Sequence, residues 1–372
     1  MQSVERMYLR NKKIMIKKDT IILSIVNCVF GGGAEKNVLE VGEHLGARYD
    51  IVFLLSGKYI DPKFYEIGRV YILPFGGRKL LLPVHLLYMG YLVVQHKARL
   101  IHAHHRYPSF LATSLAKILQ VKVVSTVHNR FPDKAKLSVW GDIAIAVSYS
   151  VGKWLLEICR LDPMKLRVVH NGIEEIRLCE NEEIKIMKEK LGISNNTNIL
   201  CTVGRLTKQK NYRCLIEALS LVKNPNWVLL LIGDGEEKDA LRKQAVELGL
   251  EKKIYFLGHR LDVQRIMQAS DIFVLSSLWE GLPYVVLEAL CCGLPIISTD
   301  VGGVSEAVID KETGILVPPG IPEMLAIGID KLIDDDMLKE TYSKKGKELF
   351  NHRFKKRTML KKVDLIYKEL IG

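Results

Sequence analysis

Residues 271–303, DIFVLSSLWEGLPYVVLEALCCGLPIISTDVGG, place a strand, a helix and a second strand in close succession. Asp271 to Leu275 is a short apolar run typical of a buried parallel strand, and a polar loop leaves its carboxyl end. Pro283 suits the first turn of a helix. A second strand follows over residues 294–299, and Gly302-Gly303 lies where a further helix is expected to begin. This order predicts an internal strand–helix–strand unit of a parallel sheet.

Several groups that could bind a ligand are expected at one edge of that sheet. The helix after Pro283 is apolar nearly all round, which predicts burial, and yet it contains Glu288. A buried carboxylate is costly unless a cation or a ligand hydroxyl pairs with it. Glu280 ends the preceding loop, and Gly302-Gly303 would expose backbone N–H groups to an anion at a helix N-terminus. Open α/β sheets bind ligands at the carboxyl ends of their strands, so these groups predict a ligand site.

Length and charge limit the classes of protein that fit. The chain has 372 residues, 48% hydrophobic and 26% charged, which is enough for two α/β domains with separate cores. Its 54 Lys and Arg residues against 42 Asp and Glu residues give a net charge of +12. Such an excess suggests an anionic partner: a nucleotide diphosphate, a phosphorylated lipid, an anionic membrane or a nucleic acid. No basic module interleaved with aromatic residues is present, which argues against nucleic acid.

The cysteines and the apolar segments indicate in which cellular compartment the protein is expected. The seven cysteines include no Cys-x-x-Cys pair, which favours a reducing cytoplasm. No signal peptide is recognisable. The apolar stretch Leu80 to Val94 is too short to cross a bilayer, and it is interrupted by Pro83 and Gly90. A helix inserted in the membrane interface and an ordinary core helix both fit this stretch.

Strands and helices alternate along the chain, which predicts two parallel sheets. Thr20 to Phe30 reads as a first strand, followed by a Gly-Gly-Gly-Ala-Glu turn, and Asn171-Gly172 is a turn that closes the first half. We expect a basic tail over residues 1–18, a first Rossmann-like domain over 19–176, a second over 177–355, and a terminal helix over 356–372 that returns to the first domain.

Histidines follow two predicted strands of the first half. His102 and His104 alternate along a strand and therefore share a side, which raises a metal-site hypothesis that lacks a third ligand in the sequence. His128 directly follows the apolar run Val121 to Val127. It could serve a site at the carboxyl end of that strand, or cap the strand as a structural residue.

Two cations occupy the first loop of the second half. Ile199 to Val203 reads as a strand, and the loop after it contains Arg205 and Lys210. An Arg fork and a Lys point charge at such a position could hold a diphosphate without a metal. Spacing alone leaves open whether Lys208 or Lys210 points inward.

The combination of these motifs resembles a known family. The set Ser276, Glu280-Gly281-Leu282-Pro283, Leu287-Glu288-Ala289, Gly293-x-Pro295 and Gly302-Gly303 resembles the signature of retaining glycosyltransferase family 4, also called glycosyltransferase group 1. The similarity extends from about Ile21 to the C-terminus; it is close in the second half and loose in the first. It implies the GT-B fold, in which two Rossmann-like parallel-sheet domains face each other across a cleft.

The resemblance also implies roles for individual residues. Arg205 and Lys210 would stabilise the departing nucleoside diphosphate, Glu280 would orient the sugar hydroxyls, and His128 would contact the sugar from the opposite domain. Glu288 would accept hydrogen bonds from the ribose. The remaining donor-binding residues implied are Gly32, Gly33, Gly302 and Gly303 for backbone contacts, and Gly258 and Arg260 near the base and ribose.

The implied activity is a metal-independent retaining hexosyltransferase without a cofactor. It would move a sugar from a nucleoside-diphosphate sugar, with UDP favoured, to a glycan or lipid-linked acceptor in bacterial-type cell-surface polysaccharide or glycolipid synthesis. We expect a cytoplasmic protein, with attachment to the inner face of an anionic plasma membrane left open, and no nucleic-acid partner. A nucleotide-sugar epimerase of the same fold and a catalytically silent partner subunit are the alternatives.

Overall fold

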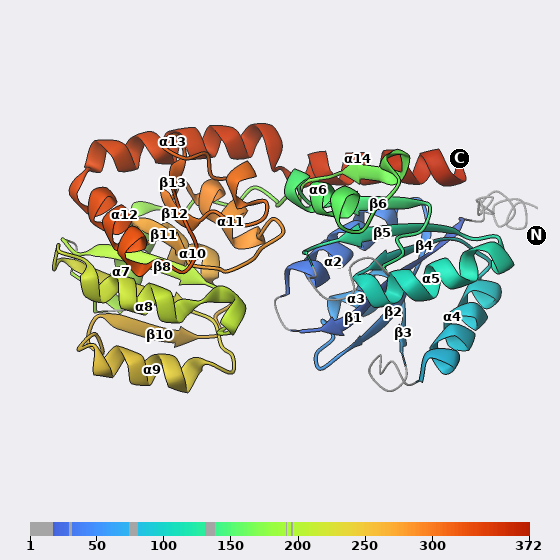
Figure 1. Ribbon diagram of the computed structural model, residues 1–372, viewed down its shortest axis with the longest axis horizontal. Coiled ribbons are helices and arrows are strands. Elements are labelled where there is room, and N and C mark those ends of the chain that lie inside the picture. Colours follow the sequence, from blue (N-terminus) through green and yellow to red (C-terminus); the bar gives the residue numbers. More distant parts are fainter. Residues whose placement is uncertain (1–17, 30–31, 74–80, 131–137, 191, 195) are drawn as a thin grey trace, which may run out of the picture. The chain divides into compact units, whose positions relative to one another are not determined.

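The structure, a computed structural model, describes residues 18–29, 32–73, 81–130, 138–190, 192–194 and 196–372. It contains two parallel sheets covered by helices, as Figure 1 shows. The strand orders are β3-β2-β1-β4-β5-β6-β7 and β10-β9-β8-β11-β12-β13. Two Rossmann-like parallel-sheet domains were predicted, and this fold class is confirmed.

The first sheet uses the strands β1 (Thr20–Cys28), β2 (Asp50–Gly57), β3 (Arg69–Ile72), β4 (Ala98–His104), β5 (Lys122–Val127), β6 (Ile143–Ala146) and β7 (Leu166–Val168). The helices that alternate with them are α2 (Gly33–Leu45), α3 (Lys63–Ile67), α4 (Leu82–His96), α5 (Arg106–Leu119) and α6 (Tyr149–Glu157). A 3-10 turn, η4 (Pro163–Lys165), precedes β7.

The second sheet uses β8 (Asn198–Val203), β9 (Trp227–Ile232), β10 (Ile254–Gly258), β11 (Ile272–Leu275), β12 (Ile296–Thr299) and β13 (Gly314–Val317). Its helices are α7 (Asn181–Lys190), α8 (Tyr212–Leu221), α9 (Lys238–Glu247), α10 (Val263–Gln268), α11 (Tyr284–Cys292), α12 (Pro322–Asp334) and α13 (Asp336–Arg353). The 3-10 turns are η5 (Lys208–Lys210) and η6 (Val304–Glu306), and α14 (Lys356–Ile371) ends the chain.

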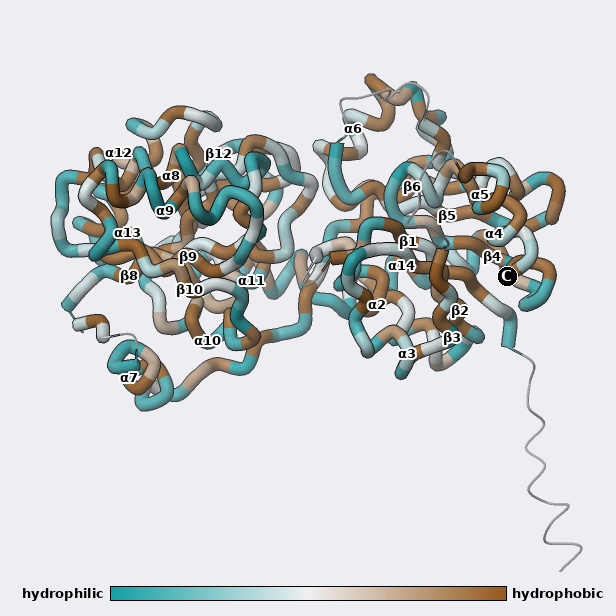
Figure 2. The backbone as a smooth tube through the Cα atoms, turned by 90° about the horizontal axis from the view of Figure 1, so that it is seen from below, coloured by the Kyte–Doolittle hydropathy of each residue, from teal (hydrophilic) through white to brown (hydrophobic). Residues whose placement is uncertain are grey.

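Apolar strands form the core of each sheet. Ile22 of β1 pairs with Val52 on one side and Ile101 on the other, and all three are fully buried. In the second sheet Leu200 of β8 is likewise buried between Leu229 and the first residue of β11. Parallel strands are covered by helices on both faces, which is why these runs are hydrophobic throughout (Figure 2).

The described residues form two compact units. The first comprises those within residues 1–125, 139–142 and 367–372, and the second those within 126–138 and 143–366. The second unit therefore includes the end of β5 with His128 as well as the whole second sheet. Every predicted site residue except Gly32 and Gly33 belongs to this second unit.

One predicted helix is absent. The expected helix opening at Gly302-Gly303 was wrong, because only the three-residue turn η6 follows. The Gly303 N–H, expected to face an anion, donates to the Gly281 carbonyl oxygen at 2.6 Å. The turn stops because the Ile309 N–H donates to the Thr313 hydroxyl oxygen rather than to a helical carbonyl.

The apolar stretch predicted over Leu80 to Val94 corresponds largely to α4, although Leu80 itself lies outside the described residues. One face of α4 enters the core through Met89 and Leu92. No helix in the described ranges is long and apolar enough to cross a membrane. The basic tail predicted over residues 1–18 lies outside the described residues except for Lys18.

The strand histidines of the first unit are core residues. His102 and His104 share a side, as predicted, with ring centroids 4.3 Å apart. The Tyr367 hydroxyl of α14 lies 2.5 Å from His102 Nδ1, and burial lowers the pKa of His102 to about 3. Within the described ranges, no three His, Cys, Asp or Glu side chains are grouped so that they could hold a metal ion. His102 therefore joins the end of α14 to β4 as a neutral, buried side chain.

Candidate active site

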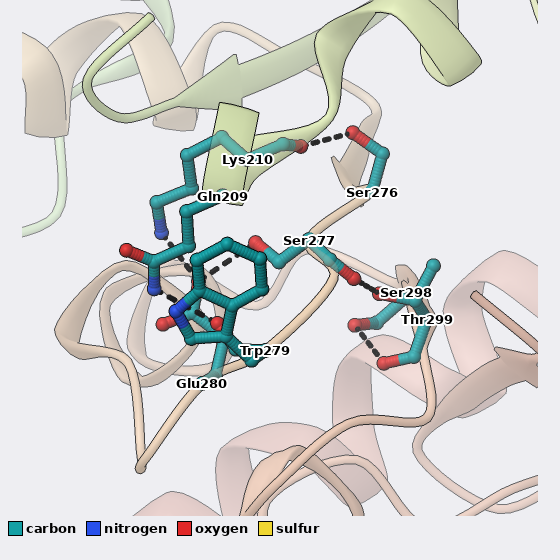
Figure 3. A network of polar contacts seen from close by, with 8 residues as sticks. All are labelled: Gln209, Lys210, Ser276, Ser277, Trp279, Glu280, Ser298 and Thr299. Carbon is teal, nitrogen blue, oxygen red and sulfur yellow. Dashed lines mark hydrogen bonds and ion pairs between the residues drawn. The ribbon is translucent and has the colours of Figure 1, made fainter. Parts of the chain in front are cut away.

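A buried ion pair lies at the carboxyl ends of β8 and β11. Lys210 Nζ donates to Glu280 Oε1 at 2.6 Å, and the two side chains are 15% and 8% exposed. The Ser277 hydroxyl donates to the same oxygen at 2.7 Å, as Figure 3 shows. Glu280 Oε2 accepts no hydrogen bond from the described part of the chain. The carboxylate is therefore held through one oxygen, and the other is available to a ligand.

Backbone contacts between two loops select Lys210 as the inward cation. Leu278 N–H donates to the Gln209 carbonyl at 2.8 Å, and the Gln209 side-chain amide donates to the Trp279 carbonyl at 2.8 Å. The Ser276 hydroxyl donates to the Lys210 carbonyl, also at 2.8 Å. These bonds fix η5 against the loop that carries Glu280. Lys208, the alternative cation, is exposed at the other end of η5.

A glycine at the end of β8 makes room for the Lys210 side chain. Gly204 has a φ of +158°, and a Cβ there would lie 2.8 Å from the Tyr212 hydroxyl and 3.1 Å from Lys210 Cε. The first distance is shorter than real Cβ contacts allow. A larger residue would displace Tyr212 or Lys210, so the glycine is part of how the pair is positioned.

Three backbone segments meet beside Glu280. Gly302 has a φ of +60°, and a Cβ there would lie 1.8 Å from the Glu280 carbonyl oxygen. A Cβ on Gly281 would lie 1.9 Å from the His128 carbonyl oxygen. The loop after β11, the turn after β12 and the end of β5 are therefore in direct contact. Of the predicted site residues, the structure brings together Lys210, Glu280, Gly302, Gly303 and His128.

Arg205 lies on the same loop as Lys210 and is exposed. Its neighbour Leu206 is buried and anchors the loop, since Leu206 N–H donates to the Asp234 carbonyl at 2.9 Å. The Arg205 guanidinium forms no ion pair with any described residue. The loop thus presents one paired cation, Lys210, and two exposed cations, Arg205 and Lys208, which suits a diphosphate with several charged oxygens.

Comparison with known proteins identifies the family. Residues 183–349 match the family Glycosyl transferases group 1, and residues 31–177 match Glycosyltransferase Family 4. The Escherichia coli UDP-Gal:alpha-D-GlcNAc-diphosphoundecaprenol alpha-1,3-galactosyltransferase is 32% identical over 268 residues, which cover 66% of this chain and 69% of that protein. The chain belongs to the group 1 glycosyltransferases.

Further matches agree with this assignment. The N-acetyl-alpha-D-glucosaminyl L-malate synthase of Bacillus anthracis is 27% identical to this glycosyltransferase over 73% of the chain and 75% of the synthase. Anabaena HepE, crystallised with UDP and glucose, superposes with a TM-score of 0.84 at 22% identity, over 95% of this chain and 100% of HepE. The fold of the glycosyltransferase is therefore GT-B, as the resemblance implied.

The other predicted donor residues in the second unit of this glycosyltransferase lie on α11, at the end of β10 and in the loop after β10. Glu288 is on the second turn of α11 and is partly exposed rather than buried, although α11 is otherwise apolar. Gly258 ends β10 with a φ of +65°, and its Cβ position is open space. Arg260 pairs with Asp262 through two bonds of 2.8 and 2.6 Å. This pairing raises the pKa of Arg260, and it occupies part of the guanidinium that was predicted to face the donor.

Gly32 and Gly33 are described separately because they belong to the first unit. They open α2, and Glu35 in its first turn accepts the Val29 N–H at 2.7 Å. A Cβ on Gly32 would lie 2.0 Å from Glu35 Oε2. Gly32 is therefore required by this glutamate, and whether it also contacts a phosphate stays a prediction.

No sequence motif indicated a second, partly buried carboxylate close to this site. Glu306 of η6 accepts the N–H groups of Tyr149 and Ser150, each at 2.9 Å, and lies 2.7 Å from His170 Nε2. Burial alone would raise the pKa of Glu306, but the bonds from His170 and the two amides lower it overall. Glu306 thus joins the turn after Gly303 to the N-terminus of α6, where a negative charge is favoured.

Proposed function

We propose that this glycosyltransferase moves a hexose, with retention of anomeric configuration, from a nucleoside-diphosphate sugar to a glycan or lipid-linked acceptor. UDP is the favoured nucleotide, and bacterial-type cell-surface polysaccharide or glycolipid synthesis is the favoured process. The observation that carries the proposal is the Lys210–Glu280 pair together with Arg205, an exposed cation on the same loop as Lys210. It supplies cations for a leaving diphosphate and a carboxylate oxygen for a sugar hydroxyl in one place.

The chemistry follows from these charges. When the bond between the anomeric carbon and the diphosphate oxygen breaks, negative charge grows on the diphosphate, and Arg205 and Lys210 would stabilise it. The acceptor hydroxyl would attack the anomeric carbon from the same face, and its proton would pass to a diphosphate oxygen. Glu280 Oε2 would accept a sugar hydroxyl and hold the ring in place. No step needs a metal ion, because the two side-chain cations take that role.

The relatives support the substrate classes. The name of the E. coli relative specifies UDP-Gal as donor and a diphosphoundecaprenol-linked sugar as acceptor, and HepE was crystallised with UDP and glucose. In the proposed site Glu288 binds the ribose and His128 contacts the sugar. A cytoplasmic location suits the seven cysteines, all of which are free thiols in the structure.

The stereochemistry can be tested before the acceptor is known. Donor hydrolysis by the enzyme should release a sugar whose first-formed anomer matches the donor, read by proton NMR before mutarotation. The reaction is run in EDTA with a panel of nucleotide sugars. We expect one UDP-sugar to be hydrolysed with retention. Release of the opposite anomer would contradict retention, and release of a different sugar would favour an epimerase.

A variant tests the proposed role of Glu288 in binding the ribose of the donor. Glu288→Gln removes the charge proposed to bind the ribose and should raise the KM for the donor by about tenfold. Glu312→Gln, on an exposed turn, is the matched control and should leave the KM unchanged. Equal KM values for the two variants would contradict the ribose-binding role of Glu288.

A further inference from the structure

Helix α4 of the first unit has an apolar face turned to solvent. Val84, Leu87, Tyr91 and Val94 are 40%, 76%, 57% and 64% exposed. Their spacing of three, four and three residues puts them on one side of the helix. From Leu82 to His96 the helix contains no Lys, Arg, Asp or Glu. An exposed stripe over three helical turns, with no charge on it, exceeds the scattered apolar residues of an ordinary surface.

The neighbouring helix α5 extends this apolar surface. Tyr107 of α5 lies against α4, with its hydroxyl 2.6 Å from His85 Nδ1. Phe110 and Ile118 follow Tyr107 at positions that lie on the same side of α5, and they are 38% and 79% exposed. Figure 1 shows α4 and α5 side by side. We define the α4–α5 face by the side chains Val84, Leu87, Tyr91, Val94, Phe110 and Ile118.

The sequence around this face is basic and free of acidic residues. Residues 67–132 contain no Asp or Glu. The same segment contains nine basic residues: Arg69, Arg78, Lys79, Lys97, Arg99, Arg106, Lys117, Lys122 and Arg130. In a chain with 42 acidic residues among 372, so long a gap is a marked charge asymmetry.

Three of these cations border the apolar side chains. Lys97 caps the C-terminus of α4, Lys117 precedes Ile118 on α5, and Lys122 begins β5. All three are exposed, and none forms an ion pair with another described residue. By contrast, Arg99 is neutralised by Asp19 at 2.8 Å. The face thus combines an apolar centre with unpaired positive charge at one end.

We propose that the α4–α5 face docks on an anionic lipid bilayer. Helix α4 would lie in the plane of the interface, with Leu87 and Tyr91 among the acyl chains and Lys97 and Lys117 at the lipid headgroups. Interfacial helices bind by this combination of apolar burial and attraction to anionic lipid. The helix is too short to span the bilayer, so it rests on one leaflet.

The charge pattern favours a lipid surface over a second copy of the chain. A symmetric dimer through this face would place Lys97, Lys117 and Lys122 of both copies in one interface, and the segment that carries the face supplies no acidic residue to pair with them. Like charges placed together across an interface are unfavourable. An anionic bilayer instead offers negative headgroups next to an apolar layer, which complements both parts of the face.

The inference deepens the proposed function and rests on it for its biological purpose, since a lipid-linked acceptor would be presented at such a surface. Its test needs no turnover. The full chain is mixed with vesicles of phosphatidylcholine alone or with 30% phosphatidylglycerol, and bound protein is measured by flotation. We expect binding to the anionic vesicles at least about tenfold tighter than to the neutral ones, weakening as salt rises.

Matched variants locate the binding surface. Leu87→Ser combined with Tyr91→Ser should weaken binding to anionic vesicles by at least about tenfold. Lys117→Glu should weaken it at low salt and have less effect at high salt. The controls, Met337→Ser at an 81% exposed apolar position of α13 and Lys345→Glu, should bind as the parent does. All changed side chains are exposed, so each variant should fold with an unaltered melting temperature.

The results that would overturn the inference are distinct. Vesicle binding that is equal in the parent and the Leu87→Ser, Tyr91→Ser variant would place the contact elsewhere. A parent dimer that becomes monomeric in this variant, by light scattering, would show that the face binds a second copy. UDP binding is measured on every variant in parallel. If the parent does not bind UDP, the proposed function is refuted. If the parent binds UDP but not the vesicles, only the docking face is refuted.

Discussion

The Lys210–Glu280 pair places two opposite charges in a site that has little access to water. Removing such a pair from solvent costs several kcal/mol, and mutual attraction offsets most of that cost, so the pair adds little net stability. It instead gives each group a fixed position before substrate arrives. Preorganised charge of this kind is worth most in the transition state, because the protein does not need to reorganise as charge develops.

Lys210→Met should lower kcat by about 100-fold or more, because a cation that stabilises the leaving diphosphate is lost. Lys208→Met, two residues away on the exposed side of η5, should change kcat by less than about twofold. Both are measured by nucleoside-diphosphate release with the nucleotide sugar that the hydrolysis panel selects. If the two variants lose activity equally, Lys210 does not have the special role that its contact with Glu280 suggests.

Gly302→Ala should destabilise the fold and weaken donor binding together. The added Cβ would lie 1.8 Å from the Glu280 carbonyl oxygen, so the loop carrying Glu280 must shift. Gly320→Ala is the matched control, because Gly320 also has a positive φ, +76°, but open space around its Cβ position. Backbone strain alone costs about 1 kcal/mol in each, and we expect Gly302→Ala to cost at least about 2 kcal/mol more by chemical denaturation. Equal destabilisation would contradict the close packing of the two loops.

Among the elements, η6 and α6 are joined by Glu306. Glu306→Gln keeps the shape of the side chain but loses the charge that faces two backbone N–H groups and His170. We expect a loss of about 1–2 kcal/mol of unfolding free energy at pH 7. The folded-state pKa of Glu306 lies below its usual value, so its ionised form stabilises the fold at neutral pH. That contribution disappears as pH falls from the unfolded pKa, about 4.3, through the folded one.

Urea denaturation of the parent and the Glu306→Gln variant from pH 3 to pH 7 measures this effect. The difference between their unfolding free energies should be largest at pH 7 and shrink towards pH 3. Glu312→Gln, for an exposed carboxylate on a nearby turn, should track the parent at every pH. A constant difference between parent and Glu306→Gln would show that the charge on Glu306 is not what stabilises α6.

The strands and helices were largely predictable because their periodicity is local. The strand expected from Asp271 to Leu275 is β11 within one residue, and the helix expected after Pro283 is α11. The helix expected at Gly302 failed for two reasons. The Gly303 N–H donates to Gly281 on another loop, and the Thr313 hydroxyl, four residues after Ile309, accepts the N–H that would continue the turn. Single hydrogen bonds that end an element leave no periodic signal in the sequence.

Across the whole molecule, the burial of the seven cysteine thiols indicates how tightly the cores are packed. Five are buried, and burial raises the pKa of Cys28 and Cys201 to about 12 each and of Cys214 to about 11. Cys292 is partly exposed, but burial of its thiol also raises its pKa. Thiolate is the reactive form, so these groups should resist alkylation near pH 8.

Iodoacetamide at pH 8 should therefore modify one thiol quickly, that of the partly exposed Cys179, and the others only as the protein unfolds. Mass spectrometry of peptides over time identifies the sites. Cys179→Ser should abolish the fast phase. Rapid modification of Cys201 or Cys28 in the folded protein would show that the cores around β8 and β1 are more open than the structure indicates.

The site could be predicted in part at this scale. Glu280, Lys210 and the Gly302-Gly303 turn were recognised by family motif, but their contacts join segments far apart in the chain, since Lys210 and Glu280 are 70 residues apart. The choice between Lys208 and Lys210 depends on the 3-10 turn η5, which the sequence did not reveal. His170 and Glu306, 136 residues apart, belong to no motif and became visible only in the folded chain.

The central claim is that the Lys210–Glu280 loop pair and Arg205 form a metal-free site for a nucleoside diphosphate. Thermal stabilisation of the full chain in EDTA by UDP, GDP and ADP, for the parent and Arg205→Gln, tests it most directly. We predict that UDP raises the melting temperature selectively, by a shift that corresponds to about 2.7 kcal/mol at a hundredfold excess over Kd, and that Arg205→Gln greatly reduces this shift. No stabilisation of the parent by any of the three nucleotides, with or without Mg²⁺, would contradict the account.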